Sequence, residues 1–106
     1  MDCTSAFITL ASERFEAVVA FYSALLGQGA EPYRRDRYAE FRLPGLRLAI
    51  FRPQPDQADT FSGATSGAMS LCLEVVDLAA AIARLTGLGY PPGPVLTASH
   101  GREVYA

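Results

Sequence analysis

The residues of this chain that could do chemistry recur at a spacing of two within short apolar segments. That spacing places side chains on one face of a β-strand. Four such segments together would bring aromatic rings, hydroxyls, a carboxylate, a guanidinium and a thiol to one surface: Phe7, Thr9, Tyr38, Glu40, Arg47, Phe51, Ser70 and Cys72. Mostly apolar walls with a few placed polar groups are typical of a small-molecule site.

Two kinds of ligand contact are expected from this surface. The planar guanidinium of Arg47 could hold a carboxylate or phosphate. The rings of Phe7, Tyr38 and Phe51 could stack on a flat ligand. A competing interpretation is that the arginines and carboxylates form solvated cross-strand pairs on an open face. The charges fit both interpretations equally, whereas aromatic rings gathered in a concavity favour binding.

No catalytic residue is identified by the sequence. His100 is the single histidine and stands in a Ser-His-Gly turn, where a solvated side chain is expected. Cys72 has no neighbour in sequence that would activate its thiol, so an inert buried thiol is expected. The sequence contains no nucleophile elbow, P-loop, dinucleotide-binding glycine loop or HExxH zinc motif.

Two amphipathic helices are predicted to position these segments. Residues 14–27 carry apolar side chains at spacings of three and four, which indicates a helix with one apolar face. Ser12 precedes this helix as an acceptor for free backbone N–H groups, and Gly27 ends it. A second helix is predicted over residues 78–88, with Asp77 as its N-terminal cap.

Strands are predicted wherever apolar, β-prone runs occur between turn residues. These runs are residues 6–11, 38–43, 46–52, 69–76, 94–99 and 102–106, with a short edge strand within 31–37. The faces opposite the chemistry-bearing residues are apolar and are expected under the helices: Ile8, Leu10, Leu48, Ile50, Leu71 and Leu73. Residues 53–68 are predicted to form a connecting loop, either a linker or a flap over a site.

The order of strand and helix occurs twice at a constant offset. Leu10 and Leu73 take matching places in the first strand of each copy. Phe15 and Leu78 take matching places in the two helices. Each pair is 63 residues apart (73 − 10 and 78 − 15). An internal repeat of this kind predicts a fold built from two similar modules.

The two copies, FITLASERFEAVVAFYSALLG and SLCLEVVDLAAAIARLTGLGY, resemble the vicinal oxygen chelate superfamily of glyoxalases, bleomycin-resistance proteins and extradiol dioxygenases. The FYxxLLG motif at 21–27 and the EVxDLxxAIxRL motif at 74–85 carry most of the resemblance. It implies an α+β fold of paired βαβββ modules whose sheets curl into a shared cup. A single domain is expected, with module one at about 5–52, the connecting loop at 53–68 and module two at 69–106. The second module is expected to be one strand short.

The resemblance also implies where a metal would be held. Metal-dependent members place His, Gln or Glu at one position in each of four strands, and the matching positions here are Phe7, Ala49 and Ser70. The fourth position would lie on the missing strand. None of the three side chains is a suitable ligand for a divalent ion, so no metal and no cofactor is expected.

A metal-independent protein that binds a small hydrophobic or carboxylated molecule is therefore the expected function, comparable to the drug-sequestering branch of the superfamily. The alternative is a metal-dependent lyase, isomerase or dioxygenase of the glyoxalase type, with unusual ligands such as Glu40, Glu74 or His100. A dimeric scaffold without a ligand is the third interpretation.

Composition excludes several other classes of partner. The 106 residues fit one domain, and half of them are hydrophobic. A formal charge of −2 provides no basic field for nucleic acid, and no apolar run approaches the ~20 residues of a membrane helix. Two cysteines without a metal-binding spacing or an export signal predict a reduced, cytoplasmic protein. The unpaired sheet edge expected in the second module predicts a homodimer.

Overall fold

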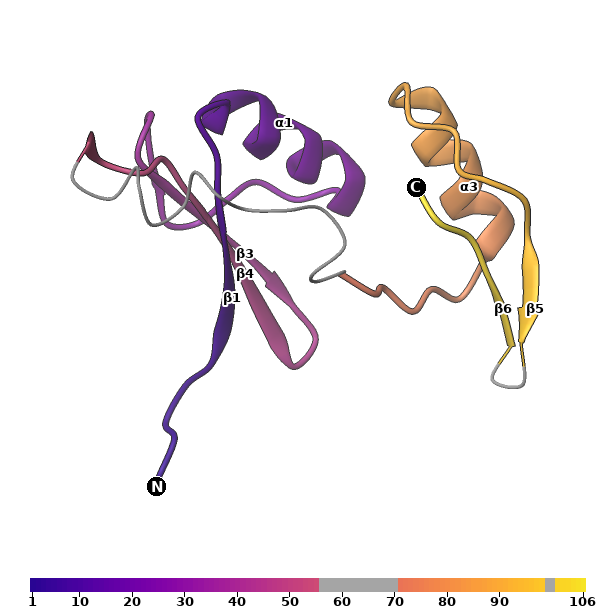
Figure 1. The fold of residues 1–106 in the computed structure, drawn as a ribbon, viewed down its shortest axis with the longest axis horizontal. Coiled ribbons are helices and arrows are strands. Elements are labelled where there is room, and N and C mark those ends of the chain that lie inside the picture. The colour runs from indigo at the N-terminus through magenta and orange to yellow at the C-terminus, as the bar shows by residue number, and fades with distance from the viewer. Residues whose placement is uncertain (56–70, 99–100) are drawn as a thin grey trace. The chain divides into compact units, whose positions relative to one another are not determined.

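The computed structural model describes residues 1–55, 71–98 and 101–106, and the chain divides into two compact units, Met1–Ser66 and Gly67–Ala106 (Figure 1). Helix α1 (Phe15–Leu26) belongs to the first unit and helix α3 (Leu78–Gly87) to the second. The two helices begin 63 residues apart (78 − 15), as the repeat predicts. No helix within the described residues is both long and apolar enough to cross a membrane.

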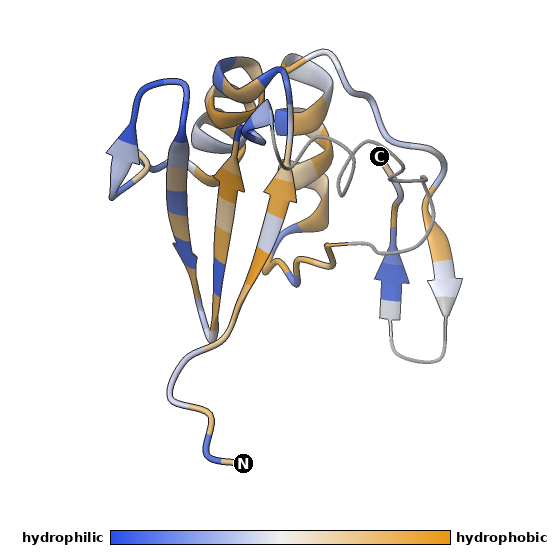
Figure 2. Ribbon diagram, turned by 60° about the vertical axis from the view of Figure 1, so that its left-hand side comes forward, coloured by the Kyte–Doolittle hydropathy of each residue, from blue (hydrophilic) through white to orange (hydrophobic). Residues whose placement is uncertain are grey.

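The first unit is a four-stranded sheet with α1 on one face (Figure 2). Its strands are β1 (Phe7–Ala11), β2 (Tyr33–Arg34), β3 (Tyr38–Leu43) and β4 (Leu46–Phe51), in the order β1-β4-β3-β2. β1 runs parallel to β4, and the other two pairs are antiparallel. The turn between β3 and β4 contains Gly45 at φ +70°, a left-handed conformation that glycine adopts without strain. The predicted α+β class is confirmed.

The core of the first unit lies between α1 and the sheet. Its fully buried members are Phe15 on the helix and Ala39, Phe41, Leu48 and Ile50 on the strands, with Ala49 buried from the other face. Phe41 pairs with Leu48, and Ala39 with Ile50, so the strand members share one face. The Tyr22 ring of α1 lies 6.4 Å from the Phe41 ring. The prediction that Leu48 and Ile50 face the helix is therefore confirmed.

The ends of α1 show how local sequence fixes the helix. Ser12 Oγ accepts a hydrogen bond from the backbone N–H of Arg14 (3.0 Å), just before the first helical residue. In the first turn, the Glu16 carboxylate accepts from the Tyr33 hydroxyl (2.7 and 2.8 Å) and from the Asp36 N–H. These hydrogen bonds, that of Tyr33 foremost, hold the pKa of Glu16 below its usual range. Gly27 ends the helix at φ +68°, as predicted.

The second unit contains α3 and a two-stranded antiparallel sheet, β5 (Leu96–Ala98) and β6 (Gly101–Glu103). Asp77 Oδ1 accepts a hydrogen bond from the Ala80 N–H (3.0 Å), which confirms the predicted cap. β5 lies within the predicted run 94–99, β6 begins one residue before the predicted run 102–106, and both are shorter than expected. The apolar side of α3 is only half-buried.

The predicted strand at 69–76 is wrong for its described residues, 71–76, which form no strand. A strand persists where a neighbour pairs with its N–H and C=O groups, and the described strands of this unit pair only with each other. β-propensity alone does not replace that partner. Cys72 is exposed, which contradicts the expected buried thiol. Leu73 is exposed as well, and Leu71 is only half-buried, so the expectation that Leu73 lies under a helix is wrong.

Candidate functional site

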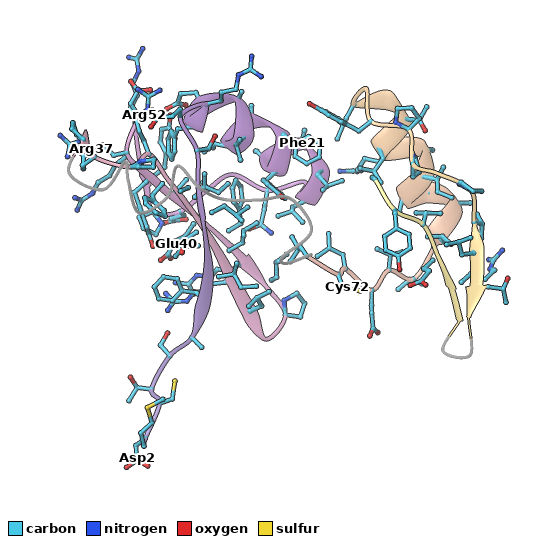
Figure 3. The ribbon with its side chains drawn as sticks, in the orientation of Figure 1. Asp2, Phe21, Arg37, Glu40, Arg52 and Cys72 are labelled. Carbon is cyan, nitrogen blue, oxygen red and sulfur yellow. The ribbon has the colours of Figure 1, made fainter. Side chains whose placement is uncertain are left out.

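The face of the first-unit sheet turned away from α1 collects six of the predicted site residues. Cross-strand pairing sets Phe7 beside Arg47, Thr9 beside Ala49, and Glu40 beside Ala49. Tyr38 stands beside Phe51. This surface, called the open face below, thus carries Phe7, Thr9, Tyr38, Glu40, Arg47 and Phe51. In Figure 3, Glu40 projects on this side of the strands, whereas Phe21 lies on α1 on the other side.

Glu40 is the buried charged residue of the open face, with only 7% of its surface exposed. The Tyr38 hydroxyl donates a hydrogen bond of 2.6 Å to Glu40 Oε1. Arg47 Nη1 lies 3.6 Å from Glu40 Oε2, which is close enough for an ion pair and too long for a hydrogen bond. Two neighbours on the same face therefore hold one carboxylate from opposite sides.

Arg47 is oriented by three contacts within the chain. Its guanidinium lies 4.8 Å from the centre of the Phe7 ring, donates a hydrogen bond to Ser5 Oγ, and forms the ion pair with Glu40. Its charge is thus already matched by a carboxylate. These contacts favour the interpretation that Arg47 pairs with Glu40 across the strands over the interpretation that it binds a ligand carboxylate.

Tyr38 is held in its protonated form. Burial and the hydrogen bond to Glu40 raise the pKa of Tyr38 to about 12. Because this pKa exceeds the ordinary value of 10, the contribution of Tyr38 to stability is complete below pH 10 and is lost as pH rises toward about 12. Titration followed by tyrosine ultraviolet absorbance should show a component near pH 12 that Tyr38→Phe removes. A Tyr38→Phe curve that overlays the wild-type curve would contradict this assignment.

An open hollow of about 650 Å³ adjoins Glu40 at the β2 side of the sheet. Its lining residues are Gln28, Gly29, Glu31, Pro32, Glu40 and Arg42. A volume of this size falls within the range of sites for small organic molecules. One wall of the hollow is therefore strand β3, and the other is the segment that follows α1.

Backbone hydrogen bonds hold that segment, residues 28–32, along β3. The Glu31 N–H donates to the Glu40 carbonyl (2.9 Å), and the Glu40 N–H donates to the Pro32 carbonyl (3.1 Å). Gln28 Nε2 donates to the Arg42 carbonyl (3.1 Å). The sequence does not predict residues 28–32 as part of a site. Residues 31 and 32 fall within the predicted edge segment 31–37. The spacing of residues in the sequence does not show that such a segment lies beside β3.

Solved structures share this fold over nearly the whole chain. A glyoxalase/bleomycin resistance protein from Catenulispora acidiphila DSM 44928 is 27% identical, with a TM-score of 0.62 over 93% of this chain and 83% of its own. The chain shares the fold of the vicinal oxygen chelate superfamily. Its fold is also shared by lactoylglutathione lyase from Agrobacterium tumefaciens, at 18% identity and a TM-score of 0.67, over 99% of this chain and 86% of that protein.

A bleomycin resistance determinant encoded on the transposon Tn5 is similar as well. It is 23% identical, with a TM-score of 0.60 over 96% of this chain and 88% of its own. No protein-family model and no curated protein matches the chain. The similarity to the superfamily therefore rests on the fold and on the structural motifs of the sequence.

The superfamily's metal positions can be compared with the side chains present. Phe7 and Ala49 stand on the open face, and their hydrocarbon side chains offer no lone pair to an ion. Across residues 1–55, 71–98 and 101–106, no three His, Cys, Asp or Glu side chains gather to hold a metal. The side chains of Phe7 and Ala49 therefore do not fit a divalent ion. Ser70, the third position, lies outside the described residues.

The remaining candidates belong to the second unit or fall outside the described residues. Cys72 is a free, exposed thiol of the second unit, and Glu74 is an exposed carboxylate there. His100 lies outside the described residues, as do residues 56–68 of the connecting loop. The site built from contacts is thus the open face of the first unit together with the hollow.

Proposed function

We propose that this protein of the vicinal oxygen chelate fold is a metal-independent binding protein for a small organic molecule. The observation that carries the proposal is the almost fully buried Glu40 carboxylate on the wall of the hollow. Tyr38 and Arg47 offset the cost of burying this charge, and the carboxylate adjoins a space of ligand size. Phe7 adds an aromatic ring that is 45% exposed on the same face.

The alternative is a metal-dependent lyase, isomerase or dioxygenase, in keeping with the similarity to a lactoylglutathione lyase. It would need ligands at unusual positions. Glu40 is already engaged by Tyr38 and Arg47, and the two side chains at superfamily metal positions on the open face are hydrocarbon. The similarity to a glyoxalase/bleomycin resistance protein agrees with either function, so the hydrocarbon side chains at the metal positions favour binding.

Calorimetric titration of chelator-dialysed protein with small aromatic compounds tests this function. Binding should persist without metal and should weaken by about two- to tenfold in Arg42→Ala, which removes a side chain from the wall of the hollow. Tyr105→Ala, which truncates an exposed ring in the second unit, serves as the control and should bind as wild type does. Binding or lyase activity that appears only with an added divalent metal would contradict the proposal.

We also propose that the protein forms a homodimer in which a second copy covers residues 71–76. Val75 and Val76 are exposed apolar side chains of this segment, which has no partner strand among the described residues. Exposed backbone and apolar side chains in one short segment favour pairing with another chain. The identical copy is the partner always present at matching concentration, and isologous pairing closes the assembly.

Sedimentation should therefore give twice the 11.4 kDa of one chain. Val75→Lys should shift the mass toward one chain, whereas Ala83→Lys on the exposed side of α3 should leave it unchanged. A mass of 11.4 kDa at all micromolar concentrations would rule the dimer out.

A further inference from the structure

The Glu40 carboxylate has more hydrogen-bond acceptor capacity than its neighbours use. An ionised carboxylate offers about four acceptor sites on its two oxygens. The Tyr38 hydroxyl occupies one of them on Oε1. Arg47 approaches Oε2 only to 3.6 Å and donates its hydrogen bond to Ser5 instead. Oε2 therefore keeps acceptor positions that no donor among the described residues fills, on a residue that is 7% exposed.

The charge balance of the hollow points in the same direction. Its wall carries two carboxylates, Glu31 and Glu40, and one guanidinium, Arg42. Arg47, the other cation of the open face, is committed to Glu40, to Ser5 and to the Phe7 ring. Arg47 thus offsets the charge of Glu40, and Arg42 opposes Glu31. A ligand carboxylate would find no unmatched cation among the described residues of the wall, whereas a charged N–H donor would find acceptor positions open on Glu40.

We infer that the ligand of the hollow carries a cationic head group with N–H donors, an amidinium or a primary ammonium, which Glu40 accepts through Oε2. This inference rests on the proposed function and names its ligand class. It replaces the expected carboxylated ligand by one of opposite charge. A charged N–H donor also makes the stronger class of hydrogen bond to a carboxylate.

Three probes of nearly the same size and shape separate charge from shape: benzamidinium (+1), benzamide (neutral) and benzoate (−1). Titration into the full-length, chelator-treated protein should rank benzamidinium tightest and benzoate weakest. Added salt should weaken benzamidinium binding and leave benzamide binding nearly unchanged, since only the first depends on charge.

Glu40→Gln keeps an oxygen for the Tyr38 hydrogen bond and removes the charge. This variant should bind benzamidinium at least about tenfold more weakly, with little change for benzamide. Glu13→Gln removes an exposed carboxylate from the residues before α1 and serves as the matched control, with all three affinities unchanged.

The wild-type ranking tests the inference even if Glu40→Gln fails to fold. Benzoate or benzamide binding tighter than benzamidinium would overturn the cationic ligand class and leave the proposed binding function standing. An unchanged benzamidinium affinity in folded Glu40→Gln would also overturn it. Failure of all three probes to bind would overturn both the inference and the proposed function.

Discussion

Replacing Phe41 by Ala is expected to lower the free energy of unfolding by about 3–5 kcal/mol, the usual cost of truncating a buried phenylalanine. Phe41 is fully buried on the α1 side of β3, beside Leu48 of β4 and the Tyr22 ring. The loss combines the transfer of the ring to water with the cavity left between helix and sheet. A domain of this size has a total stability of only about 5–15 kcal/mol, so denaturant unfolding should show a large shift in midpoint.

Phe7→Ala is the matched control, because it removes the same ring from the opposite face of the same sheet, where Phe7 is 45% exposed. Its destabilisation should be less than half that of Phe41→Ala. Equal losses for the two variants would contradict the assignment of the core to the α1 side, since a shift of register by one residue exchanges the two faces.

The second large effect is expected from Tyr38→Phe, which should destabilise the fold by about 1–3 kcal/mol. The substitution removes one oxygen and leaves the volume of the ring. It takes away the 2.6 Å hydrogen bond to Glu40 Oε1, and that carboxylate stays nearly buried. The cost is therefore that of an unsatisfied buried acceptor rather than of a cavity.

Tyr33→Phe provides a control with the same chemistry at an exposed position. The Tyr33 hydroxyl also donates to a glutamate, Glu16, but both residues are solvated and water can replace the lost donor. Chemical denaturation of the two variants should show the larger loss for Tyr38→Phe. A larger loss for Tyr33→Phe would show that burial of Glu40 does not govern the strength of its hydrogen bond.

Much of the first unit, and helix α3 of the second, could be predicted from the sequence because their determinants are local. Apolar spacing located both helices, Gly27 and Asp77 marked a helix end and a helix start, and alternation along β3 and β4 assigned their two faces. The six residues of the open face follow from the same alternation. Each of these features depends on residues only a few positions apart.

The failed and missed predictions depend on distant neighbours. Residues 71–76 have strand-forming side chains, but a strand also needs a partner, which the sequence does not display. The ion pair of Arg47 with Glu40 likewise joins residues of two different strands, and the sequence alone does not display it. The hollow arises where residues 28–32 return along β3, a contact made by backbone groups that every residue possesses.

The most direct test of metal-independent binding at the open face is a map of amide chemical shifts during titration with benzamidinium in the presence of a chelator. The largest changes should occur at Glu40, at Arg42 and along residues 28–32, with smaller changes at Tyr38 and Arg47. Changes confined to α1 or to the second unit, or changes that require added metal, would contradict it.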